Sequence, residues 1–174
     1  MNKNIIIGIT IGIVLIIGIV LFTIIPKNEN TETIGKVDET FEISYKGIVI
    51  TPKTTFNKEA IAEEVKVSEI PSCAFEGTDN VYTYENLEIT TAKVEEKETI
   101  YSVYFTNSEM QTKEGVKITD DKAKMMEVYG NNYEEQGSKY AYTKGDVSLS
   151  FIIENDVITS IEYTWKDLGQ AITD

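Results

Sequence analysis

The sequence predicts an α+β chain, in which an N-terminal transmembrane helix precedes two tandem repeats, each a helix plus an antiparallel meander. Three observations lead to this expectation. Residues 5–25 carry no charge, a strand pattern recurs 58 residues further along, and a short amphipathic segment precedes each copy of it. The repeat is the most informative observation, because self-similarity at a fixed offset indicates a duplicated structural unit.

The two copies match in their aromatic and β-branched residues. Residues 82–84 (Tyr-Thr-Tyr) return as residues 140–142 (Tyr-Ala-Tyr), and residues 100–106 return as residues 158–164. At the same offset, residues 96–98 fall on residues 154–156. An even offset keeps each residue on the same side of its strand, so the buried and exposed faces of the two copies are expected to correspond.

The uncharged run at residues 5–25 is long enough to cross a membrane. As a helix its 21 residues span about 31 Å. No small-residue cleavage site precedes Pro26, so an uncleaved anchor is predicted, with the N-terminus cytoplasmic and the following domain extracytoplasmic. Gly8 and Gly12 form a small-xxx-small pair that could support a homodimer through this helix, although glycine is common in membrane helices in any case.

The rest of the chain divides by composition and pattern. We expect a cytoplasmic stub at residues 1–4, a polar linker at 26–40, repeat 1 at 41–110, repeat 2 at 111–166 and a tail at 167–174. Helices are predicted at residues 58–67, capped by Asn57, and after Thr119 or Asp120 as the N-cap through residue 129. Strands are predicted at residues 81–84, 87–92, 99–106, 139–143, 147–153 and 157–165.

Charge and composition exclude several classes of function. The net charge is −13 and no arginine or histidine is present. An acidic chain is unsuited to nucleic acid, and the lack of histidine rules out histidine-based catalytic dyads, triads and zinc sites. No phosphate-binding loop or spaced carboxylate pair is found, so neither an enzyme, a metal nor a cofactor is predicted. The lone Cys73, beside alanine and phenylalanine, is interpreted as a buried apolar residue rather than a redox thiol.

Strand alternation predicts one buried face and one open, Ser/Thr-rich face for each sheet. In the last strand Val157, Ile161, Tyr163 and Trp165 are expected to point inward, whereas Glu162 points outward. The residues proposed to bind a partner on the open face are Tyr104, Ile152, Glu88 and Glu162, and Ile100 and Ile158 are also expected to lie there.

One known module resembles this pattern. Residues 115–119, a short helix ending at Tyr129 and Gly130, a Tyr-x-Tyr strand and a three-stranded meander ending at residues 157–161 are similar to the module of β-lactamase inhibitory proteins and of small outer-membrane assembly lipoproteins of the SmpA/OmlA type. The tandem arrangement resembles the inhibitory proteins, which bind a partner on a sheet face. Thr119 and Asn131 stand where that family often has glycine and proline, and fold similarity alone does not transfer a function.

The sequence therefore predicts a membrane-anchored, extracytoplasmic module without catalytic activity that binds a protein or peptide through its open sheet face. The alternative is a structural or assembly subunit of a cell-envelope complex, held partly through its anchor helix. The acidic surface predicts a basic or mixed-charge partner whose binding weakens with salt.

Overall fold

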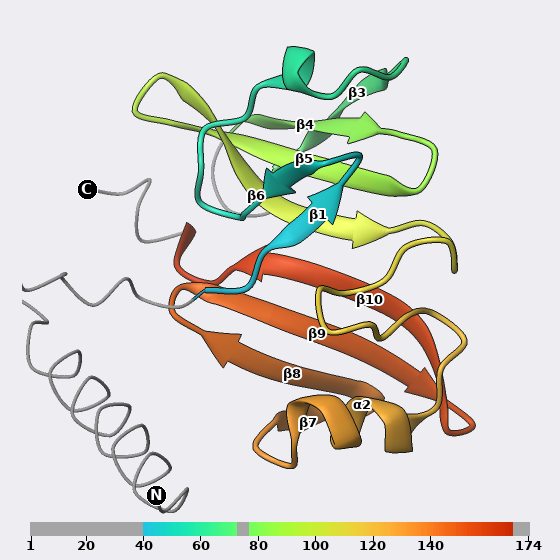
Figure 1. Cartoon of the computed structure of the whole chain (residues 1–174). Helices are drawn as coiled ribbons and strands as arrows, with labels where there is room; N and C mark the ends of the chain where they lie inside the picture. The colour runs from blue at the N-terminus through green and yellow to red at the C-terminus, as the bar shows by residue number, and fades with distance from the viewer. Residues whose placement is uncertain (1–39, 73–76, 169–174) are drawn as a thin grey trace, which may run out of the picture. The chain divides into compact units, whose positions relative to one another are not determined.

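The computed structural model describes residues 40–72 and 77–168. The chain divides into two units, Met1–Val37 and Asp38–Asp174, and all described residues belong to the second. This unit is mostly β, with ten strands, one 3₁₀ turn and one α-helix among the described residues (Figure 1).

Eight strands form one antiparallel sheet in the order β3-β4-β5-β6-β10-β9-β8-β7. Each half is a four-stranded meander, and the two meanders join through their last strands. The strands of the first meander are β3 (Lys66–Pro71), β4 (Thr78–Thr83), β5 (Leu87–Val94) and β6 (Lys97–Phe105). Those of the second are β7 (Glu134–Gln136), β8 (Lys139–Lys144), β9 (Val147–Glu154) and β10 (Val157–Trp165).

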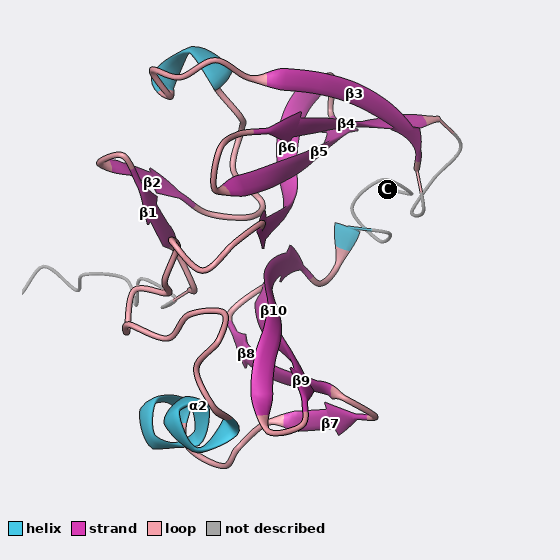
Figure 2. Ribbon diagram, turned by 90° about the vertical axis from the view of Figure 1, so that its right-hand side faces the viewer, coloured by secondary structure: helices cyan, strands magenta, loops and turns pink. Residues whose placement is uncertain are grey.

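One face of this sheet carries the remaining elements. The hairpin of β1 (Ile43–Tyr45) and β2 (Ile48–Ile50) and the helix α2 (Lys122–Tyr129) all lie on the same side of the strands (Figure 2). The core fills the space between them, where aliphatic and aromatic side chains from both meanders are fully buried: Leu87, Ile89, Val103, Phe105, Leu149, Phe151, Ile161 and Tyr163. No described helix or strand lies on the other side, which we call the open face.

Helix α2 has clear capping residues. The Asp121 side chain accepts a hydrogen bond from the Lys124 backbone N–H at 2.7 Å, which makes it the N-cap. Gly130 ends the helix with a φ of 80° and a ψ of −167°, a conformation that is essentially restricted to glycine. The predicted second helix is therefore confirmed, with its N-cap one or two residues later than expected.

The two meanders keep the repeat that the sequence predicts. Strands β6 and β10 pair antiparallel with Tyr104 directly opposite Glu162, and these residues are 58 positions apart. Each hairpin also has a bulge in its second strand, at Tyr101 in β6 and at Thr159 in β10, again 58 apart. Equivalent strands that pair antiparallel at equivalent residues are related by a local two-fold axis. This axis passes between Tyr104 and Glu162.

The hairpin turns show where the repeat departs from a constant offset. The turns are Glu95-Glu96 and Asn155-Asp156, and all four residues have positive φ. They lie 60 residues apart, so the predicted match of residues 96–98 with 154–156 is wrong by two positions. The second copy is two residues shorter between turn and bulge.

The predicted fold class is wrong in its helices. The described residues of repeat 1 contain no α-helix: the segment expected to be helical contains only the 3₁₀ turn Lys58–Ala60, called η1, and then enters β3. Asn57 still caps this turn by accepting from the Glu59 N–H at 3.1 Å. Valines and an isoleucine at residues 65–70 favour an edge strand over a helix. The described part of the unit therefore consists of one eight-stranded antiparallel sheet, a separate β1–β2 hairpin and a single α-helix, not two helix-plus-meander repeats.

The predicted fold class also included a transmembrane helix, and the described residues contain no such helix. None of the helices within residues 40–72 and 77–168 is long and apolar enough to cross a membrane. The predicted span itself, residues 5–25, lies outside the described residues.

The bulges explain which strand residues were assigned to the wrong face. An extra residue at Thr159 reverses the alternation at the start of β10, so Ile158 is buried and Val157 is exposed. The bulge at Tyr101 does the same in β6, and Ile100 is buried rather than exposed. Beyond each bulge the predicted inward positions Val103, Phe105, Ile161 and Tyr163 are confirmed as buried.

Candidate functional site

The open face is organised around one row of residues that crosses the whole sheet. Because each residue pairs with the next, the row follows the strand register from edge to edge. In sheet order it consists of Lys66, Thr83, Glu88, Tyr104, Glu162, Ser150, Ala141 and Glu134. The register thus brings together three of the four predicted site residues, Glu88, Tyr104 and Glu162, on three adjacent strands.

Tyr104 stands between two carboxylates at the centre of this row. Directly opposed residues on neighbouring strands have Cβ atoms about 5 Å apart, so Glu88 and Glu162 flank the tyrosine ring on both sides. The Tyr104 side chain is 36% exposed, which makes it one of the few large apolar side chains to reach solvent among the described residues. An aromatic face between two acids is an arrangement that suits a cation.

Both carboxylates are held by hydroxyl groups of the same face. Thr83 donates a hydrogen bond to Glu88 Oε1 at 3.1 Å. Ser102 hydrogen-bonds to Glu162, and Lys139 lies near enough to act on its charge. Burial nevertheless raises the pKa of the Glu162 carboxyl, because desolvation outweighs the opposing effects of Lys139 and Ser102.

A second row, displaced by two residues along each strand, is almost entirely hydroxylic. In sheet order it consists of Ser68, Val81, Thr90, Ser102, Thr164, Ser148 and Thr143. The predicted Ser/Thr-rich open face is therefore confirmed.

The fourth predicted residue, Ile152, lies further along β9 on the same face. It pairs with Ser160 and with Lys139, and it is half-buried. It is thus two residues beyond Ser150 and outside the row of Tyr104. The predicted dimer residues Gly8 and Gly12, and the lone Cys73, lie outside the described residues.

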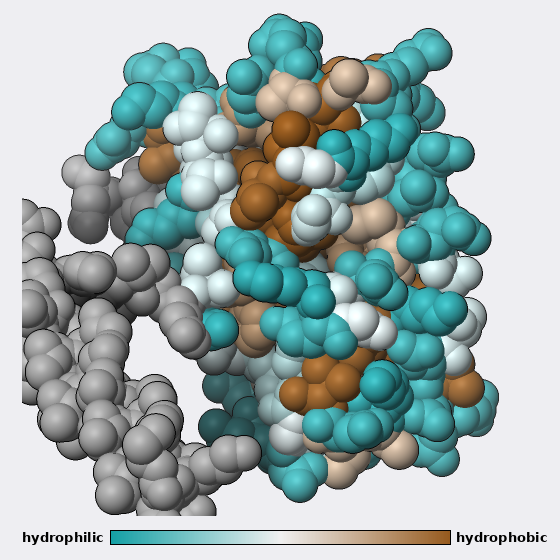
Figure 3. Space-filling view, viewed as in Figure 1, coloured by the Kyte–Doolittle hydropathy of each residue, from teal (hydrophilic) through white to brown (hydrophobic). Residues whose placement is uncertain are grey.

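Apolar side chains also reach the surface on the other side of the sheet. Figure 3 shows apolar side chains over the β1–β2 hairpin, bordered by hydrophilic ones. Val49 in β2 is 62% exposed there. Since β1 and β2 pair only with each other, this surface belongs to the cover of the core and not to the open face.

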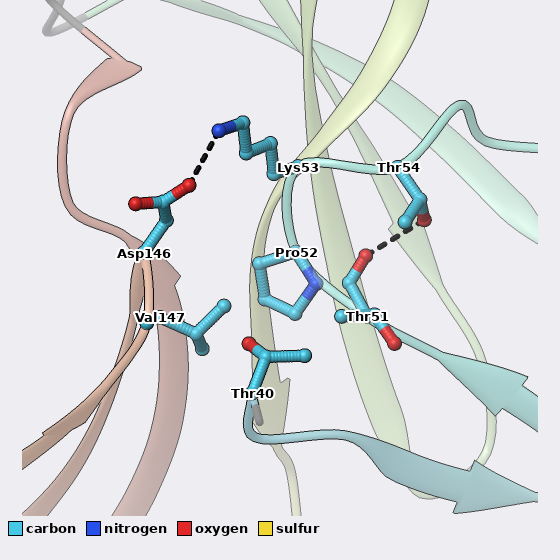
Figure 4. Close-up of a pocket in the computed structure, with 8 residues that line it drawn as sticks. Thr40, Thr51, Pro52, Lys53, Thr54, Asp146 and Val147 are labelled. Carbon is cyan, nitrogen blue, oxygen red and sulfur yellow. Dashed lines mark hydrogen bonds and ion pairs between the residues drawn. The ribbon is translucent and has the colours of Figure 1, made fainter. Parts of the chain in front are cut away.

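A cavity of about 290 Å³ lies where the two meanders diverge. The start of β6 leaves β10 and bonds instead to the segment after β2, with Lys53 N–H donating to the Ile100 carbonyl at 2.8 Å and Phe56 N–H to the Glu98 carbonyl at 2.8 Å. The cavity opens between this segment and the β8–β9 turn. Figure 4 shows Pro52 and Val147 facing each other across it.

The chemistry of this cavity is limited. Its only ionisable lining residues are Lys53 and Asp146, which form an ion pair with each other (Figure 4). The Lys53 ammonium also lies 5.8 Å from the centre of the Trp165 ring. This neutralised pair lies beside threonine, proline and valine side chains and supplies no free acid or base. We therefore interpret the cavity as part of the junction between the two meanders and not as a reactive site.

The half-buried carboxylate of Glu98 was not singled out from the sequence. Oε1 of Glu98 accepts from Asn80 Nδ2 at 2.8 Å, from the Tyr82 hydroxyl at 2.7 Å and from the Thr91 hydroxyl at 2.7 Å. Burial raises the pKa of Glu98, but these three hydrogen bonds outweigh it and the net pKa is lowered. The strand was predicted to begin only at residue 99, whereas β6 begins at Lys97, so alternation assigned Glu98 to neither face.

Within the described ranges, no group of three or more Cys, Asp and Glu side chains is arranged to hold a metal ion. Comparisons with family models, curated proteins and solved structures find no match to this chain. The resemblance to β-lactamase inhibitory proteins therefore stays a prediction.

Proposed function

We propose that this domain is a binding module without catalytic activity, which recognises a protein or peptide through the open face of its sheet. The partner would place a lysine or arginine side chain over Tyr104. The observation that carries the proposal is the register that sets Glu88, Tyr104 and Glu162 side by side on three adjacent strands.

A cationic side chain would gain from each of these groups. The tyrosine ring attracts a cation through its face, and the two carboxylates supply the opposite charge from either side. The hydroxyls of the neighbouring row would accept or donate further hydrogen bonds. With a net charge of −13 the chain as a whole also draws basic partners, and this long-range part of the attraction weakens with salt.

The proposal also rests on the rigidity of the site. Its residues lie in the middle of an eight-stranded sheet, next to the core residues Val103 and Tyr163 on the other face. A binding surface that is already ordered pays little conformational entropy on association. The alternative, an assembly subunit held through Gly8 and Gly12, gains no support from the described residues.

The experiment is a selection of random peptides displayed on their encoding nucleic acid, with the full chain as bait. A second bait carries Tyr104→Ala and Glu162→Gln. We expect the parent chain to enrich peptides that contain lysine or arginine, and we expect the double variant to bind them at least about tenfold more weakly.

Two results would contradict the proposal. Peptides that bind both baits equally would place recognition elsewhere, and a failure to enrich any basic peptide would remove the binding role. A matched control, Glu127→Gln in α2 on the other side of the sheet, should leave the affinity unchanged, because Glu127 is exposed and lies away from the open face.

A further inference from the structure

We infer that strand β3 is a second binding surface, at which an extended basic segment of a partner adds to the sheet as a ninth strand. β3 is the first strand of the sheet order and pairs only with β4 among the described strands. All six of its residues are exposed. An unpaired strand edge offers backbone N–H and C=O groups to an incoming strand.

Apolar side chains accompany this free edge. Val67 is 47% exposed and Ile70 is 41% exposed, and together they are two of the five large hydrophobic residues that reach solvent in the described part of the chain. They point to opposite faces, because Val67 pairs with the core-facing Tyr82 and Ile70 pairs with Asp79. A strand that lies alongside β3 would cover both of them.

Two acidic pockets flank the strand and determine the charge of the partner. The first, of about 330 Å³, is lined by Glu69, Glu96 and Glu98 together with Lys93. The second, of about 500 Å³, lies at the start of β3 and is lined by three glutamates, Glu63, Glu64 and Glu85, together with Lys66. The lining of the first pocket thus has an excess of two negative charges. In the second pocket Lys46, which is not part of the lining, pairs with Glu63 at 3.0 Å and leaves an excess of one. Basic side chains would complement both.

The register gives the partner a pattern. Val67 and Glu69 share one face of β3, whereas Ser68 and Ile70 share the other. A partner strand with lysine on the first face can lay its aliphatic stem over Val67 and bring its ammonium group to Glu69. Apolar side chains on the second face would pack on Ile70. Alternating basic and apolar residues therefore fit this edge.

A second copy of the chain fits less well. In a symmetric antiparallel pair centred on Ser68, Val67 would oppose Glu69, and Lys66 would oppose Ile70, so no charge would meet its opposite. The net charge of −13 would also oppose self-association.

The test uses a fluorescent eight-residue peptide of alternating lysine and valine, titrated into the full chain at low salt. Eight extended residues span about 26 Å, which is enough to reach from one pocket to the other along a six-residue strand. The comparison peptides have alternating glutamate and valine, or the lysine–valine sequence with N-methylated backbone amides. We expect the parent peptide alone to bind, and to protect the amides of β3 from hydrogen exchange.

Variants separate this edge from general charge and from the open face. Glu69→Lys should weaken binding at least about tenfold, whereas Glu127→Lys, the same charge change in α2, should alter it less than about twofold. Tyr104→Ala should also leave it unchanged, so failure here is distinguishable from failure of the proposed function. Glu69 is exposed at the sheet edge, and its replacement leaves the core intact.

Several results would overturn the inference. These are equal weakening by both charge reversals, equal binding of the N-methylated peptide, or peptide binding without added protection of β3 amides. Dimerisation of the chain through β3, with no binding of the peptide, would assign the edge to a second copy.

Discussion

Tyr104 and Glu162 are 58 residues apart in the sequence and lie directly opposite each other at the junction of the two meanders. The local two-fold axis of the sheet passes between them, so the most central pair of the open face is also the pair that the repeat makes equivalent. Because equivalent positions carry different side chains, an aromatic residue meets a carboxylate. If both positions carried the same residue, two carboxylates or two aromatic rings would face each other.

The raised pKa of Glu162 leads to a prediction about stability. A carboxyl whose pKa is higher in the folded state than in the unfolded one binds more protons when folded, so its contribution to stability falls as pH rises through the unfolded and then the folded pKa. Glu162→Gln removes this charge. We therefore expect the variant to have a higher free energy of unfolding than the parent at pH 8, with a smaller difference at pH 3.5.

Urea denaturation at the two pH values measures this effect. Glu127→Gln, on the exposed surface of α2, is the control and should show no such pH-dependent gain. If Glu162→Gln is less stable than the parent at pH 8, the interaction of Glu162 with Lys139 and Ser102 outweighs its burial, and our account of this carboxylate is wrong.

Glu98 is predicted to stabilise the first meander. Its replacement by alanine leaves the hydroxyls of Tyr82 and Thr91 without their acceptor, and Thr91 is almost fully buried. We expect Glu98→Ala to lower the free energy of unfolding by at least about 2 kcal/mol. The neighbouring Glu96→Ala, at an exposed turn, should cost less than about 0.5 kcal/mol. Equal losses in thermal or urea unfolding would contradict this role.

The lowered pKa of Glu98 gives its contribution the opposite pH dependence to that of Glu162. A depressed folded-state pKa adds stability above the unfolded pKa, and this stability is lost as pH falls through the folded value. The stability difference between the parent and Glu98→Gln should therefore shrink on acidification below about pH 4. A difference that is constant from pH 7 to pH 3 would show that Glu98 is not ionised in the folded protein.

Gly130 is predicted to resist substitution. Its φ of 80° with a ψ of −167° is strained for any residue with a Cβ, although no neighbouring atom would be touched by that Cβ. Gly130→Ala should lower the free energy of unfolding by about 1–3 kcal/mol. Gly47→Asn is the control, because the φ of 81° at the tip of the β1–β2 hairpin is one that asparagine tolerates. If both substitutions lower the free energy of unfolding equally, the backbone conformation of Gly130 is not the cause of the loss in Gly130→Ala.

The strands and helix α2 were largely predictable from the sequence, whereas the helix predicted at residues 58–67 was wrong. Period-two alternation and turn residues located β5, β6, β8, β9 and β10 to within two residues. The segment after Asn57 has a capping residue and apolar positions spaced as in a helix. Its β-branched Val67 and Ile70 nevertheless join the edge of the sheet, because pairing with β4 supplies backbone hydrogen bonds that local propensity does not anticipate.

The candidate site was predictable in its face but not in its register. Alternation assigns Tyr104, Glu88 and Glu162 to the outer face of their strands, and the structure agrees. No local pattern states that β6 pairs with β10, so the row they form could not be deduced. The bulges at Tyr101 and Thr159 likewise leave no clear sequence signature, which is why Ile100 and Ile158 were misassigned.

The most direct test of the central claim is an NMR titration of the ¹⁵N-labelled chain with a selected basic peptide. We expect the largest amide shifts in β5, β6 and β10 around Glu88, Tyr104 and Glu162, and we expect them to disappear in the Tyr104→Ala variant. Shifts confined to the β1–β2 hairpin or to α2, on the other side of the sheet, would contradict it.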